Sequence, residues 1–172
     1  MTRSREIASQ GGLVLLNTTT FSAQSSVSFD NVFSSAYDNY RIIAAHTSTV
    51  SGSETRIRLR ASGADNTNSN YASMNQRLGE NGTSYNLTGY TSYAPVNNNN
   101  ANTNSLSFDV ISPNKAADTN FSGTAVGVMN TGSFNAAGVI GVKFDADTVF
   151  DGFTIYFSSG TITGTIKVYG YK

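Results

Sequence analysis

Apolar and polar residues alternate along short stretches of this chain, and the alternation limits its fold more than any other feature. Residues 153–158 (FTIYFS) and 166–169 (IKVY) both alternate, and Ser159 and Gly160 lie between them. A period of two is typical of a strand with one buried face. The closing residues therefore predict a hairpin that holds the C-terminal end of the chain in a sheet.

The same alternation recurs along most of the chain, between clusters of Gly, Asn, Ser and Asp. It predicts further strands at residues 13–21, 26–33, 40–50, 55–61, 71–78, 105–112, 123–130 and 137–144. Short strands separated by turn residues are typical of an antiparallel β-sandwich or barrel. We therefore expect an all-β protein with an antiparallel β-sandwich. Its predicted core consists of Val27, Phe29, Ile42, Ile57, Leu59, Phe108, Val110, Val126, Val128, Val139, Phe153, Ile155, Phe157 and Val168.

The first residues follow a different pattern. Residues 2–9 (TRSREIAS) predict a short helix that ends at Gly11 and Gly12. A helix of this length is marginal by itself, so we expect it to dock on another surface. The remaining length suits one domain. The sequence predicts an N-terminal anchoring arm over residues 1–12 and a single sandwich domain over residues 13–172.

The composition excludes several classes of protein. The chain has no cysteine, and eleven basic residues balance eleven acidic ones. Disulfides and thiolate metal sites are therefore excluded, and broad electrostatic binding to nucleic acid or to an anionic membrane is not expected. The apolar run at residues 13–16 (LVLL) is too short for a signal peptide or a membrane span. We expect a soluble protein that is made in the cytoplasm, without membrane insertion.

Few residues have the types and spacing that catalysis or metal binding needs. His46 is the single histidine, and no nucleophile or acid accompanies it in a recognisable motif, so we expect a structural role. Asp145, Asp147 and Asp151 cluster in residues 144–153 (FDADTVFDGF) and are weak candidates for calcium ligands, with a polar turn as the alternative. Neither an enzymatic activity nor a cofactor is predicted.

The segment 83–104 is polar and rich in asparagine, which predicts a long surface loop or an exposed hairpin. Tyr85, Tyr90 and Tyr93 stand in it among Ser, Thr, Gly and Asn. Rigid tyrosines among small polar residues are typical of binding loops, and exposed aromatic rings can lie flat on sugars. These three tyrosines are the candidate contacts for a ligand or a host surface.

Residues 56–60 (RIRLR) place Arg56, Arg58 and Arg60 on one face of a predicted strand, opposite Ile57 and Leu59. Arginine suits bidentate contact with phosphate, acidic sugars or the carboxylates of a neighbouring subunit. A solvated strand face or a guarded sheet edge is the alternative.

Several stretches resemble a known group of proteins. The start, MTRSREIA, is similar to a short N-terminal segment of many tailed-bacteriophage virion proteins. The end, residues 150–172 (FDGFTIYFSSGTITGTIKVYGYK), resembles a C-terminal pattern of phage structural proteins, in which a final strand closes on V-Y-G at residues 168–170. Residues 27–43 (VSFDNVFSSAYDNYRII) and 62–72 (SGADNTNSNYA) look like the body of such proteins.

The resemblance implies a jelly-roll-like sandwich on the exterior of a virion, with no catalytic residue. A capsid decoration subunit is expected first, assembled as a trimer or dimer and bound to other virion proteins, either the major capsid protein or tail proteins. Its candidate subunit contacts are Arg3, Arg5, Ile7, Arg56, Arg58 and Arg60. The alternatives are a small tail-fibre or baseplate appendage that binds host glycan through the tyrosines, and a carbohydrate-binding module.

Overall fold

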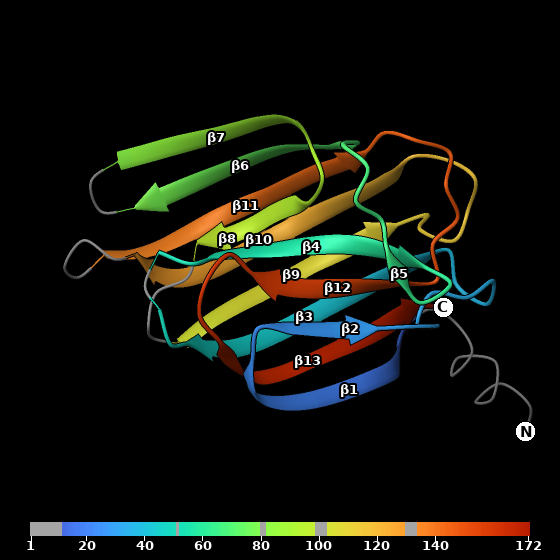
Figure 1. Ribbon diagram of the computed structural model, residues 1–172, viewed down its shortest axis with the longest axis horizontal. Helices are drawn as coiled ribbons and strands as arrows, with labels where there is room; N and C mark the ends of the chain where they lie inside the picture. The colour runs from blue at the N-terminus through green and yellow to red at the C-terminus, as the bar shows by residue number, and fades with distance from the viewer. Residues whose placement is uncertain (1–11, 51, 80–81, 99–102, 130–133) are drawn as a thin grey trace, which may run out of the picture.

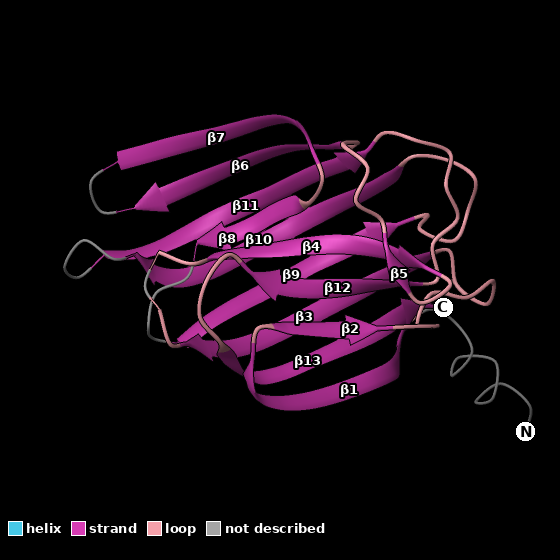
Figure 2. Ribbon diagram, in the orientation of Figure 1, coloured by secondary structure: helices cyan, strands magenta, loops and turns pink. Residues whose placement is uncertain are grey.

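The computed structural model describes residues 12–50, 52–79, 82–98, 103–129 and 134–172. Over these residues the chain forms thirteen strands and no helix (Figures 1 and 2). The strands make two antiparallel sheets that enclose one apolar core. The all-β antiparallel sandwich predicted from the sequence is confirmed. Within the described ranges, no helix is long and apolar enough to cross a membrane.

The larger sheet has eight strands in the order β1-β13-β3-β9-β10-β11-β6-β7. Strand β1 lies at one edge and β7 at the other, at the bottom and top of Figure 1. The strands are β1 (Leu13–Gln24), β3 (Asn39–Ser48), β6 (Tyr71–Gly79), β7 (Gly82–Thr91), β9 (Thr103–Ile111), β10 (Thr119–Met129), β11 (Phe134–Phe144) and β13 (Ile162–Tyr171).

The smaller sheet has five strands and covers one face of the larger sheet. Its order is β2-β12-β4-β5, and β8 also pairs with β4. These strands are β2 (Ser26–Phe29), β4 (Glu54–Ala61), β5 (Ala64–Asp65), β8 (Ala94–Asn98) and β12 (Gly152–Phe157).

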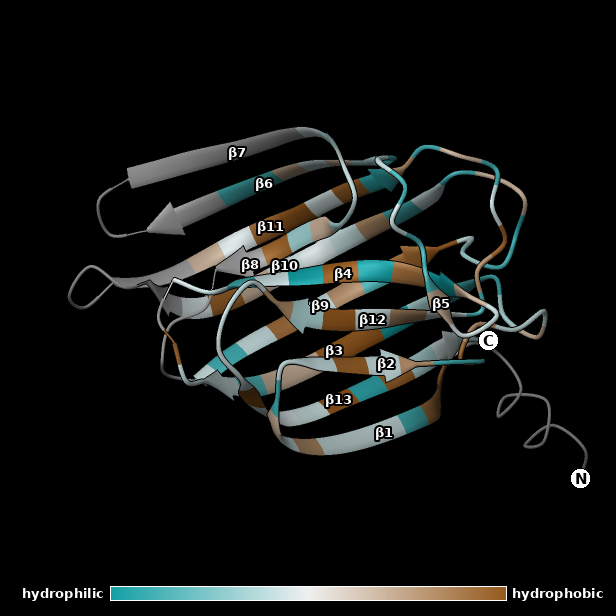
Figure 3. Ribbon diagram, viewed as in Figure 1, coloured by the Kyte–Doolittle hydropathy of each residue, from teal (hydrophilic) through white to brown (hydrophobic). Residues whose placement is uncertain are grey.

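The core forms where the apolar residues of both sheets meet. In the larger sheet Val168, Ile42 and Phe108 stand in register on adjacent strands and are completely buried. In the smaller sheet the aromatic rings of Phe29 and Phe153 stack with centroids 4.7 Å apart. Figure 3 shows the hydropathy alternating along β4, as a strand with one buried face requires.

The predicted C-terminal hairpin is wrong. Strand β12 pairs with β2 and β4 in the smaller sheet, whereas β13 pairs with β1 and β3 in the larger one. The link between them turns at Gly160, whose φ of 75° favours glycine. Two facing sheets bury their apolar sides against the same core, so alternation alone does not distinguish a hairpin from a crossing between sheets.

The predicted core is also wrong at two positions. Val126 on β10 and Val139 on β11 have about half of their surface exposed, at 50% and 51%. Ala125 and Ile140, one position away, are buried instead. The residues near Val126 are nearly all small. Their hydrophobicity therefore gives little indication of which alternate positions face the core, and the pairing of the strand with its neighbours decides which face is buried. The side chain of Val128 lies outside the described part of the chain.

The polar segment 83–104, predicted as a surface loop or a hairpin, contains most of β7, all of β8 and the start of β9. Strand β7 pairs with β6, which precedes the segment, so the expected hairpin within residues 83–104 is wrong. Strand β8 then crosses to the smaller sheet and pairs with β4. The predicted helix and most of the predicted arm, including Arg3, Arg5 and Ile7, lie outside the described residues.

Candidate functional site

The candidate tyrosines lie in different surroundings. Tyr90, near the end of β7, is 63% exposed and donates its hydroxyl to Asp145 Oδ2 at 2.7 Å. Tyr93, in the turn before β8, is half-buried, and its ring centroid lies 4.1 Å from the Arg56 guanidinium carbon. Tyr85 stands on β7 opposite Gln76, but its side chain is outside the described set.

Tyr90 belongs to a network of charged residues at one end of the larger sheet. Lys143 Nζ lies 2.9 Å from Asp145 Oδ1 and 2.9 Å from Asp118 Oδ2. The hydrogen bonds to Asp145 and Asp118 raise the pKa of Lys143 above its usual value, and the bonds from Lys143 and Tyr90 lower the pKa of Asp145. At neutral pH the ammonium of Lys143 and the carboxylate of Asp145 therefore stay charged.

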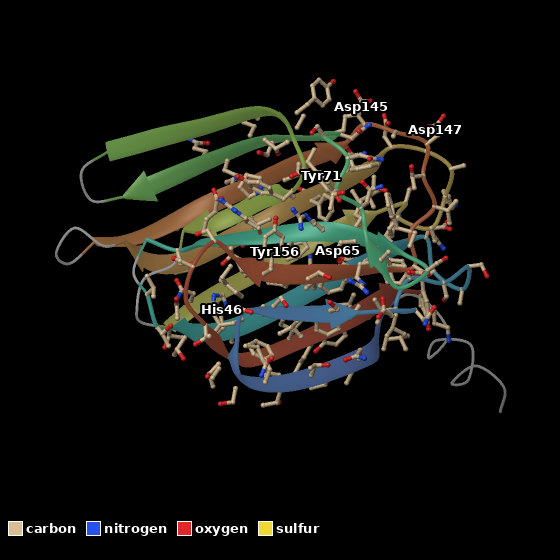
Figure 4. The ribbon with its side chains drawn as sticks, viewed as in Figure 1. His46, Asp65, Tyr71, Asp145, Asp147 and Tyr156 are labelled. Atoms are coloured by element: carbon tan, nitrogen blue, oxygen red, sulfur yellow. The ribbon has the colours of Figure 1, made fainter. Side chains whose placement is uncertain are left out.

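The calcium candidates are not brought together. Asp145 is paired with Lys143, whereas Asp151 Oδ2 accepts a hydrogen bond from the backbone N–H of Ser62 at 2.8 Å. Asp147 is exposed near Asp145 (Figure 4). Among the residues with described side chains, no group of three or more His, Cys, Asp or Glu residues could hold a metal ion. Lys143 occupies the position between two carboxylates that a cation would take.

An open depression of about 570 Å³ lies beside the Tyr90 network, on the side of the larger sheet that faces away from the core. Ala72, Met74, Asn120, Gly141 and Lys143 line it. Met74, Asn120 and Lys143 have exposed side chains, and Gly141 stands opposite Met74 in the strand register. Ser73, Phe121, Val142 and Gly89 complete the lining, and Gly89 immediately precedes Tyr90.

The three arginines of β4 lie on the outer face of the smaller sheet, as predicted, with Ile57 and Leu59 buried on the other side. Strand β4 lies between β12 and the strands β5 and β8, so the alternative of a guarded edge is wrong. Arg58 donates from Nε to the carbonyl of Ser92 at 3.0 Å, and its guanidinium covers the ring of Tyr156.

Arg60 makes the most contacts of the three. Its Nε lies 2.7 Å from Asp30 Oδ1, and its Nη1 contacts Asp65 Oδ1 and, at 3.0 Å, Thr154 Oγ1. Only 12% of its side chain is exposed. Arg56 pairs with Glu54 on its own strand at 2.6 Å and lies against the ring of Tyr93, in the turn before β8. The arginine face therefore joins β4 to its neighbours within the chain, and its predicted role as a subunit contact stays a prediction.

A second polar cluster escaped the sequence analysis. Arg41 on β3 forms a bidentate pair with Asp109 on β9, at 2.8 and 2.9 Å, and Tyr171 on β13 donates its hydroxyl to Asp109 Oδ1 at 2.6 Å. The residues come from three adjacent strands, so the cluster exists only once the register is known. The lone His46 is buried beside the ring of Phe157.

Stability is expected to fall on acidification through Asp109. Partial burial favours a higher pKa for Asp109, but the hydrogen bonds from Arg41 and Tyr171 outweigh burial and lower the pKa below its usual value. This carboxylate thus adds stability above its unfolded pKa of about 3.9, and the gain is lost as pH falls through the folded pKa. Urea midpoints between about pH 5 and pH 2 should fall less in Asp109→Asn than in wild type. Equal losses in the two proteins would contradict the expectation.

Comparisons with known proteins identify no family. No protein-family model matches the sequence. No curated protein matches it either. A solved structure of peanut lectin with a 9mer peptide (PVIWSSATG) is similar over 95% of this chain and 90% of the lectin chain, with 10% identity and a TM-score of 0.30. A likeness this weak carries no argument about what this chain binds.

Proposed function

We propose that this protein is a non-enzymatic structural subunit on the exterior of a tailed-bacteriophage virion, most simply a capsid decoration subunit. It joins its neighbours through residues 1–12 and through the exposed edge strand β1. The observation that carries the proposal is that β1 has no charged residue and exposes Leu13 and Leu15. The resemblance of both ends of the chain to phage virion proteins supports the choice of partner.

Strand β1 has the properties of an edge that a partner covers. Its twelve residues, LVLLNTTTFSAQ, include no charged residue and no proline. Free sheet edges are usually protected by lysine, proline or a bulge, because an unpaired strand can pair with other chains. Here Leu13 and Leu15 are exposed by 43% and 53%, close to the start of the strand. The strand carries two register irregularities, after Leu15 and after Phe21, but it has no charge to oppose pairing with another chain, and exposed apolar side chains on such an edge favour a protein interface.

The arm and the edge strand are continuous. Residues 1–12 lead directly into β1 at Leu13. Any surface that anchors the arm therefore brings Leu13 and Leu15 close to the same partner. Two modest contacts on one body also bind more tightly together than either does alone.

The test compares particles that are assembled with variants of the protein. Leu15→Glu places a charge on the edge and should lower incorporation into particles at least about tenfold, since a charge buried in an apolar contact costs more than 1.4 kcal/mol. Val149→Glu is the matched control, because Val149 has a similar exposure but lies outside β1. It should be incorporated normally. Normal incorporation of folded Leu15→Glu would overturn the proposed edge contact.

Truncation and imaging test the anchor and the location. Deletion of residues 1–12 should leave a folded domain that no longer joins particles. Cryo-electron microscopy of intact particles should place the sandwich on the capsid lattice. Density at the tail alone would favour the tail appendage instead. Analytical ultracentrifugation of the purified protein should show a trimer or a dimer.

A further inference from the structure

We propose that the depression beside Tyr90 binds an uncharged sugar residue of a glycan. The depression belongs to strands β6, β7, β10 and β11, whereas β1 is the opposite edge of the same sheet (Figure 1). Docking through β1 therefore leaves this end of the sheet open. The inference is independent of the proposed function, because purified protein can bind sugar whether or not it joins a particle.

The shape of the depression suits a small ring. Its volume of about 570 Å³ lies within the range typical of ligand sites. Gly89 and Gly141 contribute no side chains to its surface, and Met74 projects beside them as an exposed apolar wall. A Cβ atom added at Gly89 would meet no atom within 4 Å. The space above this glycine is thus open and can be filled by mutation without disturbing the fold.

Tyr90 provides an aromatic surface that is already held in position. Tyr90 follows the lining residue Gly89 and is 63% exposed, yet its hydroxyl is tied to Asp145 at 2.7 Å, and Asp145 is tied to Lys143 on the wall of the depression. An aromatic ring that is fixed before binding loses little entropy when a ligand stacks on it. Sugar rings present apolar C–H faces that pack on such rings, with their hydroxyls left for polar neighbours.

The charges around the depression favour a neutral ligand. Lys143 is shared by Asp118 and Asp145, so an anionic ligand would meet two carboxylates and one ammonium that is already paired. A metal ion would have to displace this ammonium. The exposed amide of Asn120, in contrast, offers both donors and an acceptor to hydroxyl groups. These features together select a polyhydroxylated, uncharged ligand.

The experiment is a titration of the purified full chain, followed by NMR, with the methyl glycosides of glucose, galactose, mannose and N-acetylglucosamine. A glycan array carrying neutral and acidic glycans extends the search to longer ligands. At least one neutral sugar should perturb the amide signals of residues near the depression, such as Met74, Asn120 and Gly141. Failure of every neutral sugar and glycan to bind would overturn the proposal, as would a preference for acidic glycans.

Variants then locate the site. Tyr90→Ala and Gly89→Leu should each weaken binding about tenfold or more, the first by removing the ring and the second by filling the space. Tyr90→Phe keeps the ring and should retain more affinity than Tyr90→Ala. Tyr169→Ala is the control, because Tyr169 stands opposite Leu15 in the strand register, near β1. Unchanged affinity in folded Gly89→Leu would show that the sugar binds elsewhere and would overturn the assignment.

Discussion

Gly152→Ala should destabilise the sandwich by about 3 kcal/mol or more, close to the upper end of the usual cost of overpacking. Gly152 begins β12, and a Cβ atom there would lie 2.0 Å from the carbonyl oxygen of Phe29 on the paired strand β2. The clashing atom belongs to the backbone, so a change of rotamer does not relieve the contact. Strand β2 has to move away, and the stack of Phe29 on Phe153 moves with it.

The measurement is the free energy of unfolding in urea, compared with Gly12→Ala as control. A Cβ atom at Gly12 would meet nothing within 4 Å, so this variant should stay within about 0.5 kcal/mol of wild type. If Gly152→Ala is as stable as the control, β2 does not pass as close to β12 as the structure places it.

Arg60→Met should cost about 2 kcal/mol, the second largest effect. Methionine keeps much of the length of the side chain but removes the cation that Asp30 and Asp65 share. Breaking a fully buried ion pair costs about 3–5 kcal/mol, because a charge is left without its partner. The side chains of Asp30 and Asp65 are 42% and 25% exposed, and water screens the remaining charges, so we expect a smaller loss.

Arg41→Met provides the comparison, since it also removes an arginine from a carboxylate on a neighbouring strand. Arg41 is 37% exposed, against 12% for Arg60, so its loss should cost about 1 kcal/mol or less. In the double variant Arg60→Met with Asp65→Asn, part of the lost stability should return, because one unpaired carboxylate is gone. Equal costs for Arg60→Met and Arg41→Met would contradict the role of Arg60 as the link between β4, β5 and β12.

The candidate ligand site was only partly visible in the sequence. Tyr90 stood out because it is an aromatic residue among small polar ones, and Asp145 because of its acidic neighbours. The contact of Tyr90 with Asp145, and of Asp145 with Lys143, was not expected. Tyr90 and Asp145 lie 55 positions apart and meet only through the pairing of β7, β6 and β11. No local pattern contains that information.

The sequence by itself determined the class of the fold and the buried face of most strands. Alternation decides these properties locally, because successive side chains of a strand point to opposite sides. Only the tertiary structure decided that β12 and β13 enter different sheets and that Val126 and Val139 face outward. It also decided that Tyr90 contacts Asp145 whereas Tyr93 packs on Arg56. Nearly every residue type forms the same backbone hydrogen bonds in a sheet, so these bonds do not specify which strands pair. The choice of neighbour and register therefore depends on how all the strands pack around one core.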